Sequence, residues 1–365
     1  MPLLRILFID DDEKSVRPAS EWAERVAFSC RVVSFIRFKE DLEDYQPHIA
    51  IVDRIEGKPP EGTDQGRLVF DEIWEHRFCP VVIYSAFPED DEDDRKRHPL
   101  VKRVTKGADL GPFTEAIEIL RPHAQGIEDA ERHIRGQFAI ALREVAPYAA
   151  SIYGEPKEYN EAVIRHGRRR LAALMDELSL GALASWEHYI HPPISKDIIM
   201  GDVIRQKEGN PEDPGAFRVV LTPSCDLVAS GKRKPKVEEV LVAACCSPKQ
   251  GIKSTALKDH DPKKLRETLI SAMLTQGFYQ KIVPFPILKG KIPPMMADLK
   301  KLDLIPISEI TLDGSGKYIR IASLDSPFRE LISWAYMQIA CRPGLPDRDF
   351  ESWRDEIIKA YEDEK

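Results

Sequence analysis

The chain has 365 residues, of which 42% are hydrophobic and 31% are charged, and its formal net charge is −8. A chain of this size is expected to form two or three globular domains with cores of their own. No segment approaches the roughly 18 uncharged apolar residues that a membrane span needs, and no basic stretch followed by an apolar core opens the sequence. We therefore expect a cytoplasmic protein that does not enter a membrane.

The acidic excess lies in the first third of the chain. Residues 1–123 contain 18 lysines and arginines against 26 acids, and the remaining residues contain 35 of each. Neither part has the basic excess expected of a duplex-binding domain, so nucleic-acid binding stays an open question.

The six cysteines show no CxxC spacing, which indicates reduced thiols and neither disulfides nor a zinc site.

The first 123 residues alternate short apolar, β-rich segments with helical signals, a pattern typical of a doubly wound parallel α/β fold. Strands are expected at 4–9, 30–35, 48–52, 80–84 and 101–104. Helices are expected at 14–28, 38–45, 67–76 and 112–120. The acidic segment 87–99 contains almost no apolar residues, so any helix there should be short.

The rest of the chain predicts two further regions. Residues 124–190 are expected to form a helical linker or dimerisation region, with a break at 153–156. Residues 191–365 are expected to form a mixed α/β output domain of unknown type around a small β-barrel or sheet. Its strands are expected near 198–204, 217–228, 237–246, 302–310 and 317–322, and its helices at 253–276, 326–341 and 347–362. A proline-rich stretch up to about residue 300 predicts irregular structure.

Polar side chains follow four of the predicted strands in the first region. They are the acids Asp10, Asp11 and Asp12, then Asp53, Ser85 and Lys106. Ligands of open parallel sheets bind beyond the carboxyl ends of the strands, so these residues should meet in one pocket. Carboxylates suit Mg²⁺, and a hydroxyl and an ammonium suit the oxygens of a phosphoryl group.

In their order and spacing, the motifs ILFIDDDEKS, IAIVD, VVIYSA and VTKGAD resemble those of the receiver domain of two-component response regulators, over about residues 3–122. The resemblance implies a flavodoxin-like five-stranded sheet. It implies that Asp53 accepts a phosphoryl group from a sensor histidine kinase or a phosphotransfer protein, assisted by Ser85 and Lys106. It also implies Mg²⁺ as the cofactor, with Asp10, Asp11, Asp53 and the backbone carbonyl of Ile55 around it.

Several positions depart from the usual receiver pattern. Gly107 follows Lys106 where receivers usually have proline, and Arg103 stands three residues before the lysine, where an aromatic residue is common. The loop after Asp53 is long, and Gly66 is the best match to the glycine that ordinarily precedes the third helix. The phosphate-accepting residues thus look retained, while the surface that normally passes the signal on has diverged.

The carboxyl-terminal half leaves three functions open. The first is a response regulator with an output domain that does not contain a helix-turn-helix and that binds a protein or nucleic acid, with homodimerisation as one option. The second is an enzyme gated by the receiver, either nuclease-like or hydrolytic, and the third is a phosphate sink without effector activity.

If the chain is an enzyme, Cys225 would be a nucleophile with His188 or His191 as base. The alternative is a turn with the side chain of Cys225 in the core. Around it, GDVI and VVLTPSCDLV loosely resemble the small barrels of toxin-type endoribonucleases.

Overall fold

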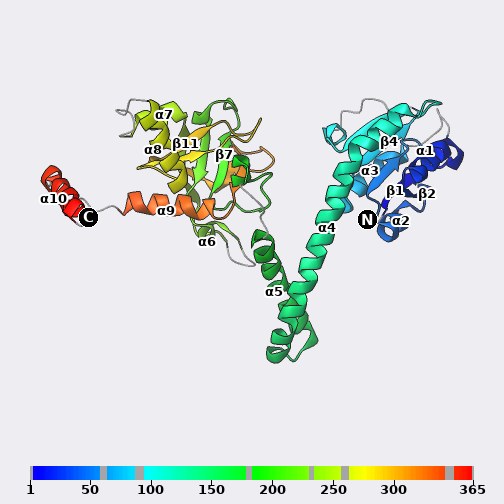
Figure 1. Cartoon of the computed structure of the whole chain (residues 1–365), viewed down its shortest axis with the longest axis horizontal. Coiled ribbons are helices and arrows are strands. Elements are labelled where there is room, and N and C mark those ends of the chain that lie inside the picture. Colours follow the sequence, from blue (N-terminus) through cyan, green and yellow to red (C-terminus); the bar gives the residue numbers. More distant parts are fainter. Residues whose placement is uncertain are drawn as a thin grey trace. The chain divides into compact units, whose positions relative to one another are not determined.

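The computed structural model describes residues 3–57, 64–86, 94–177, 183–229, 234–255, 263–341 and 349–363. The chain divides into two compact units, residues 1–180 and 181–365 (Figure 1). Among the residues described, no helix is both long and apolar enough to cross a lipid bilayer.

The amino-terminal unit is built on a five-stranded sheet in which every neighbouring pair of strands is parallel. Its strands are β1 Leu4–Ile9, β2 Phe28–Val33, β3 Ile49–Val52, β4 Val81–Ser85 and β5 Val101–Thr105. Their order is β2-β1-β3-β4-β5, which is the flavodoxin-like order. The three central strands are apolar and almost fully buried because helices cover both faces of the sheet. The predicted fold of this unit is confirmed.

Helices on the two faces of this sheet enclose two separate apolar cores. The helices that precede the last strand are α1 Glu13–Arg25, α2 Phe38–Tyr45 and α3 Gln65–His76. One core joins α1 to the helix after β5 through Phe8, Val16 and Phe113, and the other joins α2 and α3 through Leu42 and Phe70. Residues 94–97 form a single 3₁₀ turn, as short as the charge of that segment predicts, whereas residues 87–93 lie outside the described part.

The helix after β5 corrects the sequence-based expectation. In place of a helix at 112–120 followed by a separate helical region from residue 124, the structure has one helix, α4 Gly111–Ile152, of 42 residues and about 63 Å. Pro122 lies inside it, where a proline removes a backbone hydrogen bond and usually breaks the helix. The helix continues because an apolar stripe with Ile117, Leu120 and Ala124 stays buried against the sheet on both sides of the proline.

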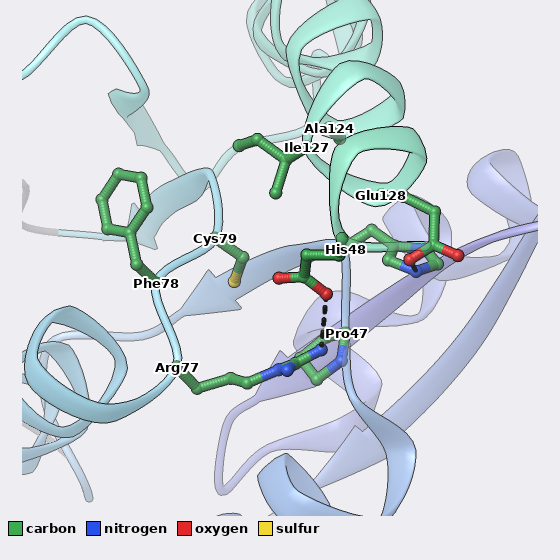
Figure 2. A pocket seen from close by; sticks show the side chains of 9 residues that line it. Pro47, His48, Arg77, Phe78, Cys79, Ala124, Ile127 and Glu128 are labelled. Atoms are coloured by element: carbon green, nitrogen blue, oxygen red, sulfur yellow. Dashed lines mark hydrogen bonds and ion pairs between the residues drawn. The ribbon is translucent and has the colours of Figure 1, made fainter. Parts of the chain in front are cut away.

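Beyond Pro122, α4 is held on the amino ends of the strands by polar contacts (Figure 2). His48, just before β3, lies with Nε2 3.0 Å from Glu128 Oε2, and Arg77 forms an ion pair of 3.6 Å with Glu131. One residue before Pro122, the guanidinium of Arg121 lies 4.4 Å from the ring centroid of Phe28. The cavity lined by His48, Arg77, Glu128 and Glu131 holds about 10 Å³, which is room for roughly one water molecule.

His48 is a neutral imidazole in this contact. Its Nδ1 accepts a hydrogen bond of 2.9 Å from the backbone N–H of Arg5, so the proton sits on Nε2 and points to Glu128. Burial and the Arg5 cation lower the pKa of His48, and Glu128 offsets only part of that effect. Burial works to raise the pKa of Glu128, yet Arg132 and His48 lower it overall.

The lowered pKa of His48 predicts a pH-dependent stability. Below the ordinary imidazole pKa of about 6.5 the unfolded chain takes up a proton that the folded chain does not, so stability falls as the pH falls. His48→Gln keeps an acceptor and a donor but does not titrate in this range. We expect the stability advantage of the wild type over His48→Gln, measured by urea unfolding, to shrink below about pH 6.5. An advantage that stays constant or grows would contradict the neutral assignment.

The amino-terminal unit ends in a helical hairpin (Figure 1). Helix α5 Pro156–Glu177 follows α4 after a three-residue turn and packs back along it. A Cβ atom added at Gly167 would lie 2.8 Å from Leu142 Cδ2, so the two helices approach closely at this point. Arg170 of α5 forms an ion pair with Glu144 of α4. The predicted break at 153–156 thus falls at the turn of the hairpin.

The carboxyl-terminal unit contains a mainly antiparallel sheet of eight strands. They are β6 Tyr189–Ile190, β7 Asp202–Gln206, β8 Phe217–Val220, β9 Glu239–Cys246, β10 Ile282–Phe285, β11 Met295–Pro306, β12 Ile310–Thr311 and β13 Tyr318–Leu324. The order is β10-β11-β9-β8-β7-β13-β12, with β6 beside β13, and β12 and β13 are parallel. The prediction of a mixed α/β unit with a sheet is confirmed.

Strand β10 and the first part of β11 correct a second expectation, because they lie in the stretch up to about residue 300 that was expected to be irregular, whereas the end of β11 overlaps the strand expected near 302–310. Pro284 is tolerated in β10, which is an edge strand where a missing N–H breaks no ladder. β11 pairs with β9 on its other side, and the register shifts between Asp298 and Leu302. These pairings, which the local composition does not signal, make the segment β structure.

Helices cover the sheet of the carboxyl-terminal unit, and apolar cores lie on both of its faces. These helices are α6 Ser224–Leu227, α7 Pro248–Lys253, α8 Lys263–Gln276 and α9 Phe328–Ala340, whereas the last helix, α10 Phe350–Asp363, buries none of its residues. The larger core contains Phe217 and Ile321 from the strands and Ile332 from α9. The smaller core contains Ile204 and Val242.

An ion pair is buried in this unit. Arg320 Nε lies 2.9 Å from Asp202 Oδ2, and both side chains are at most 1% exposed. Ser323 donates a hydrogen bond of 2.6 Å to the other carboxylate oxygen, and Arg320 donates to the carbonyl of Ser195. Burial raises the pKa of Asp202, and Arg320 offsets part of the rise. The charges are therefore compensated only as long as both partners are present.

We predict that Asp202→Asn destabilises the carboxyl-terminal unit by about 3–5 kcal/mol, because it leaves a buried guanidinium without a counter-charge. Urea unfolding of the full chain measures the change. The control is Asp355→Asn, which removes one partner of the exposed pair Arg354–Asp355 and should have a far smaller effect. Equal losses in both variants would show that the buried pair is not the cause.

Candidate functional site

The carboxyl ends of three strands bring the predicted acids and the lysine together. Ile9 at the end of β1 is opposite Val52 at the end of β3, so Asp10 and Asp53 follow at the same level of adjacent strands. Asp53 N–H donates to the carbonyl of Ile9 at 3.0 Å. The backbone N–H of Lys106, just after β5, donates to the carbonyl of Ser85 at 2.9 Å.

Lys106 is the centre of this cluster. Its Nζ lies 2.5 Å from Asp10 Oδ2 and 2.5 Å from Asp53 Oδ2. Burial raises the pKa of Asp10, and the lysine offsets part of the rise. Burial works to lower the pKa of Lys106, but its hydrogen bonds to the two carboxylates raise it overall. The lysine is therefore held as a cation.

Three carboxylates of the site are close enough for one metal ion. Oxygen atoms of Asp10, Asp11 and Asp53 lie within 4.8 Å of one another. Hard oxygen donors in this number suit Mg²⁺, which keeps several waters and takes few protein ligands. Asp11 is exposed and accepts a hydrogen bond of 2.7 Å from the N–H of Gly57. Asp12 has a different role, since it caps α1 by accepting from Lys14 N–H at 3.0 Å.

The loop after β3 shapes the surroundings of Asp53. Oδ1 of Asp53 accepts a hydrogen bond of 2.6 Å from Arg54 N–H, and Ile55 N–H lies 3.4 Å from the same oxygen. The backbone of Ile55 thus lies at the site, while its carbonyl as a metal ligand stays a prediction. Gly66, in the first turn of α3, donates to the carbonyl of Arg54 at 2.9 Å. A Cβ atom added at Gly66 would lie 2.3 Å from the carbonyl oxygen of Asp53.

We predict that Gly66→Ala destabilises the amino-terminal unit by about 1–3 kcal/mol, because the new methyl group meets backbone atoms that cannot turn away. Displacement of Asp53 should also slow any reaction of its carboxylate. The matched control is Gly136→Ala in the middle of α4, where the added Cβ meets nothing within 4 Å. That change should stabilise the helix by roughly 0.5–1 kcal/mol. Thermal unfolding of both variants gives the comparison, and a neutral Gly66→Ala would contradict it.

The remaining predicted positions lie around this cluster. Ser85 ends β4 and is only 2% exposed. Tyr84, one residue earlier, is buried with its ring 5.9 Å from Lys106 Nζ and 5.0 Å from the ring of Phe113 in α4. Arg103, which departs from the usual receiver pattern, is half-buried on β5. Aromatic packing beneath the lysine therefore comes from β4.

Ser15, in the first turn of α1, belongs to the site but was not predicted from the sequence. Lys106 Nζ donates to its Oγ at 3.2 Å, and the same oxygen lies 3.4 Å from Asp10 Oδ1. One signal was available, since Ser15 closes the motif ILFIDDDEKS, one helical turn after Asp11. A residue at that spacing faces the same edge of the sheet.

Cys225 and the two histidines considered with it are engaged in different contacts. Cys225 is exposed in the short helix α6 and lies 3.7 Å from Asp226 Oδ1, which forms an ion pair of 2.7 Å with Lys236. His188 stacks on Phe328 with the ring centroids 3.6 Å apart. His191 lies 2.7 Å from the carbonyl oxygen of Ile321. The placement of Cys225 in the core was therefore wrong, because α6 turns its side chain to the surface.

No family model matches the chain, and no curated protein matches it either. Solved structures do match part of it. The N-terminal domain of a response regulator receiver protein from Methanoculleus marisnigri JR1 is 22% identical, with a TM-score of 0.25; the match covers 32% of this chain and 94% of that one. A CheY-like receiver domain from Methylobacillus flagellatus is 17% identical, with a TM-score of 0.26 and coverages of 32% and 98%.

A third match is the N-terminal domain of a response regulator/sensory box/GGDEF 3-domain protein from Carboxydothermus hydrogenoformans. It is 19% identical, with a TM-score of 0.27, and the match covers 34% of this chain and 98% of that one. Sequence identities this low show only that the folds are similar. The parallel strand order gives the amino-terminal unit the flavodoxin-like fold that the motifs predicted, with a group of three acids at the ends of its strands. The carboxyl-terminal unit is not identified.

Proposed function

We propose that the chain is a two-component response regulator that accepts a phosphoryl group on Asp53 from a sensor histidine kinase or a phosphotransfer protein. The observation that carries the proposal is the position of the Asp53 carboxylate, beside Asp10 and Asp11 and in direct contact with the Lys106 ammonium. A structural ion pair needs one acid for one lysine. The additional acids would repel one another without a cation, which favours a site made for a metal ion and an anion.

In the proposed reaction, a carboxylate oxygen of Asp53 attacks the phosphorus atom of a phosphohistidine. A bond forms between this oxygen and phosphorus, and the phosphorus–nitrogen bond breaks with its electron pair returning to the imidazole. The product is an acyl phosphate on Asp53. Mg²⁺ held by Asp10, Asp11, Asp53 and the Ile55 carbonyl would neutralise charge on the phosphoryl oxygens.

Lys106 and Ser85 would contact the transferred group. Since Lys106 Nζ already bonds to Asp53 Oδ2, redirecting one N–H to a phosphoryl oxygen requires only a small movement. Ser85 is buried next to the lysine, and its hydroxyl is suited to donate to another phosphoryl oxygen. Both groups act by position and charge, which is how phosphoryl transfer is generally catalysed.

The carboxyl-terminal unit would act as an output domain that is not of the helix-turn-helix type. The hairpin of α4 and α5 links the receiver to it and exposes several apolar side chains, among them Ile134, Tyr148 and Ile164. Helices that expose such side chains often pair with a second copy to form a bundle. A homodimer formed through the hairpin is therefore part of the proposal.

The proposal predicts that the wild type takes up one phosphoryl group from acetyl phosphate in the presence of Mg²⁺, seen by intact-protein mass spectrometry, and that Asp53→Asn takes up none. Asp53→Asn removes the nucleophilic oxygen without changing the shape of the side chain. Chelation of the metal should abolish uptake in the wild type, because the charge on the phosphoryl oxygens is then not neutralised.

Asp44→Asn is the control for this experiment, because Asp44 is an exposed acid on α2 and not part of the cluster. It should be phosphorylated like the wild type. Phosphorylation of Asp53→Asn to the wild-type level would refute Asp53 as the acceptor. A wild type that stays unmodified with both acetyl phosphate and a cognate kinase would refute the function itself.

A further inference from the structure

A serine outside the predicted set completes the coordination of the lysine. An ammonium has three N–H groups, and those of Lys106 have three partners in Asp10 Oδ2, Asp53 Oδ2 and Ser15 Oγ. The side chain of Lys106 is only 14% exposed, so water has little access to it. Ser15 is the uncharged member of this set and comes from a helix, whereas the two acids follow strands.

The direction of the hydrogen bonds at Ser15 is fixed because its partner Lys106 has donor groups and no acceptor. Lysine can only donate, so Ser15 Oγ accepts at 3.2 Å. The hydroxyl hydrogen then points to the carbonyl oxygen of Asp12, 2.8 Å away, which is a better acceptor than Asp10 Oδ1 at 3.4 Å. A chain of hydrogen bonds thus runs from Lys106 through Ser15 to the backbone of α1. Each bond in such a chain polarises the next.

We propose that Ser15 is a positioning residue that holds the Lys106 ammonium over the acceptor carboxylate during phosphoryl transfer. The inference rests on the proposed function of Asp53. When an oxygen of Asp53 becomes part of the acyl phosphate, Lys106 gives up one of its three partners. Asp10 and Ser15 keep the other two N–H groups in place, so the released one is aimed at the phosphoryl oxygens. Without Ser15, the ammonium is held by Asp10 alone and samples orientations that do not reach the phosphoryl group.

A purely local role for Ser15 is the alternative, since serines in the first turn of a helix often bond to a carbonyl three residues earlier. Ser20 provides a matched control for that role. Its Oγ donates to the carbonyl oxygen of Arg17 at 3.1 Å, in the same helix and with the same spacing. Ser20 does not belong to the cluster around Lys106. Ser20→Ala therefore removes the local bond without touching the site.

The experiment measures the rate at which the full chain is phosphorylated by acetyl phosphate with saturating Mg²⁺. Ser15→Ala should lower the maximal rate about tenfold, which is the expected loss for one hydrogen bond to a charged group. The acetyl phosphate concentration at half-maximal rate should stay unchanged, because Ser15 acts on the transfer step. Ser20→Ala should react like the wild type.

Threonine and valine at position 15 have the same shape and differ in the hydroxyl. Ser15→Thr should react at close to the wild-type rate, and Ser15→Val should be as slow as Ser15→Ala. Equal rates for threonine and valine, or a Ser15→Ala rate equal to that of Ser20→Ala, would overturn the role of Ser15 while leaving Asp53 as the acceptor. A wild type without any phosphorylation would instead overturn the proposed function on which the inference rests.

Discussion

The contact of the Lys106 ammonium with the carboxylates of Asp10 and Asp53 joins the ends of three strands that are far apart in the sequence. The carboxylate of Asp10 is almost fully buried, and burial of an unpaired charge is strongly unfavourable. The lysine compensates it and reduces the repulsion between Asp10 and Asp53. The remaining contacts of the site, from Ser15 on α1 to the backbone of the loop after Asp53, hold these three groups in one place.

Helix α4 connects this site with the rest of the chain. It begins five residues after Lys106, and its Phe113 packs against Tyr84, whose ring also lies near the lysine. The same helix is held at the other end of the strands by His48 and Arg77, and then continues into the hairpin with α5. The packing of Tyr84 against Phe113 therefore links Lys106 to α4 without an aromatic residue at position 103.

Much of the amino-terminal unit was predictable because its signals are local. A run such as Ile49–Val52, buried on both faces of a sheet, is visible in the sequence, and so are Asp53 and Lys106 directly after their strands. The continuity of α4 across Pro122 was not predictable, because the buried residues on either side of the proline compensate for the lost hydrogen bond. Strand β10 and the first part of β11 were missed for a related reason, since the pairing of β11 with β9 and of β10 with β11 makes this segment β structure despite its prolines.

The sequence by itself determined the order of strands and helices in the amino-terminal unit and the types of side chain at its strand ends, because both depend on short stretches of chain. Only the tertiary structure decided which groups share hydrogen bonds. It brought Ser15 to Lys106, His48 to Glu128 and Asp202 to Arg320, which are pairs of residues between 80 and 118 positions apart in the sequence. Contacts of this kind arise when distant elements pack together, and no local pattern specifies them.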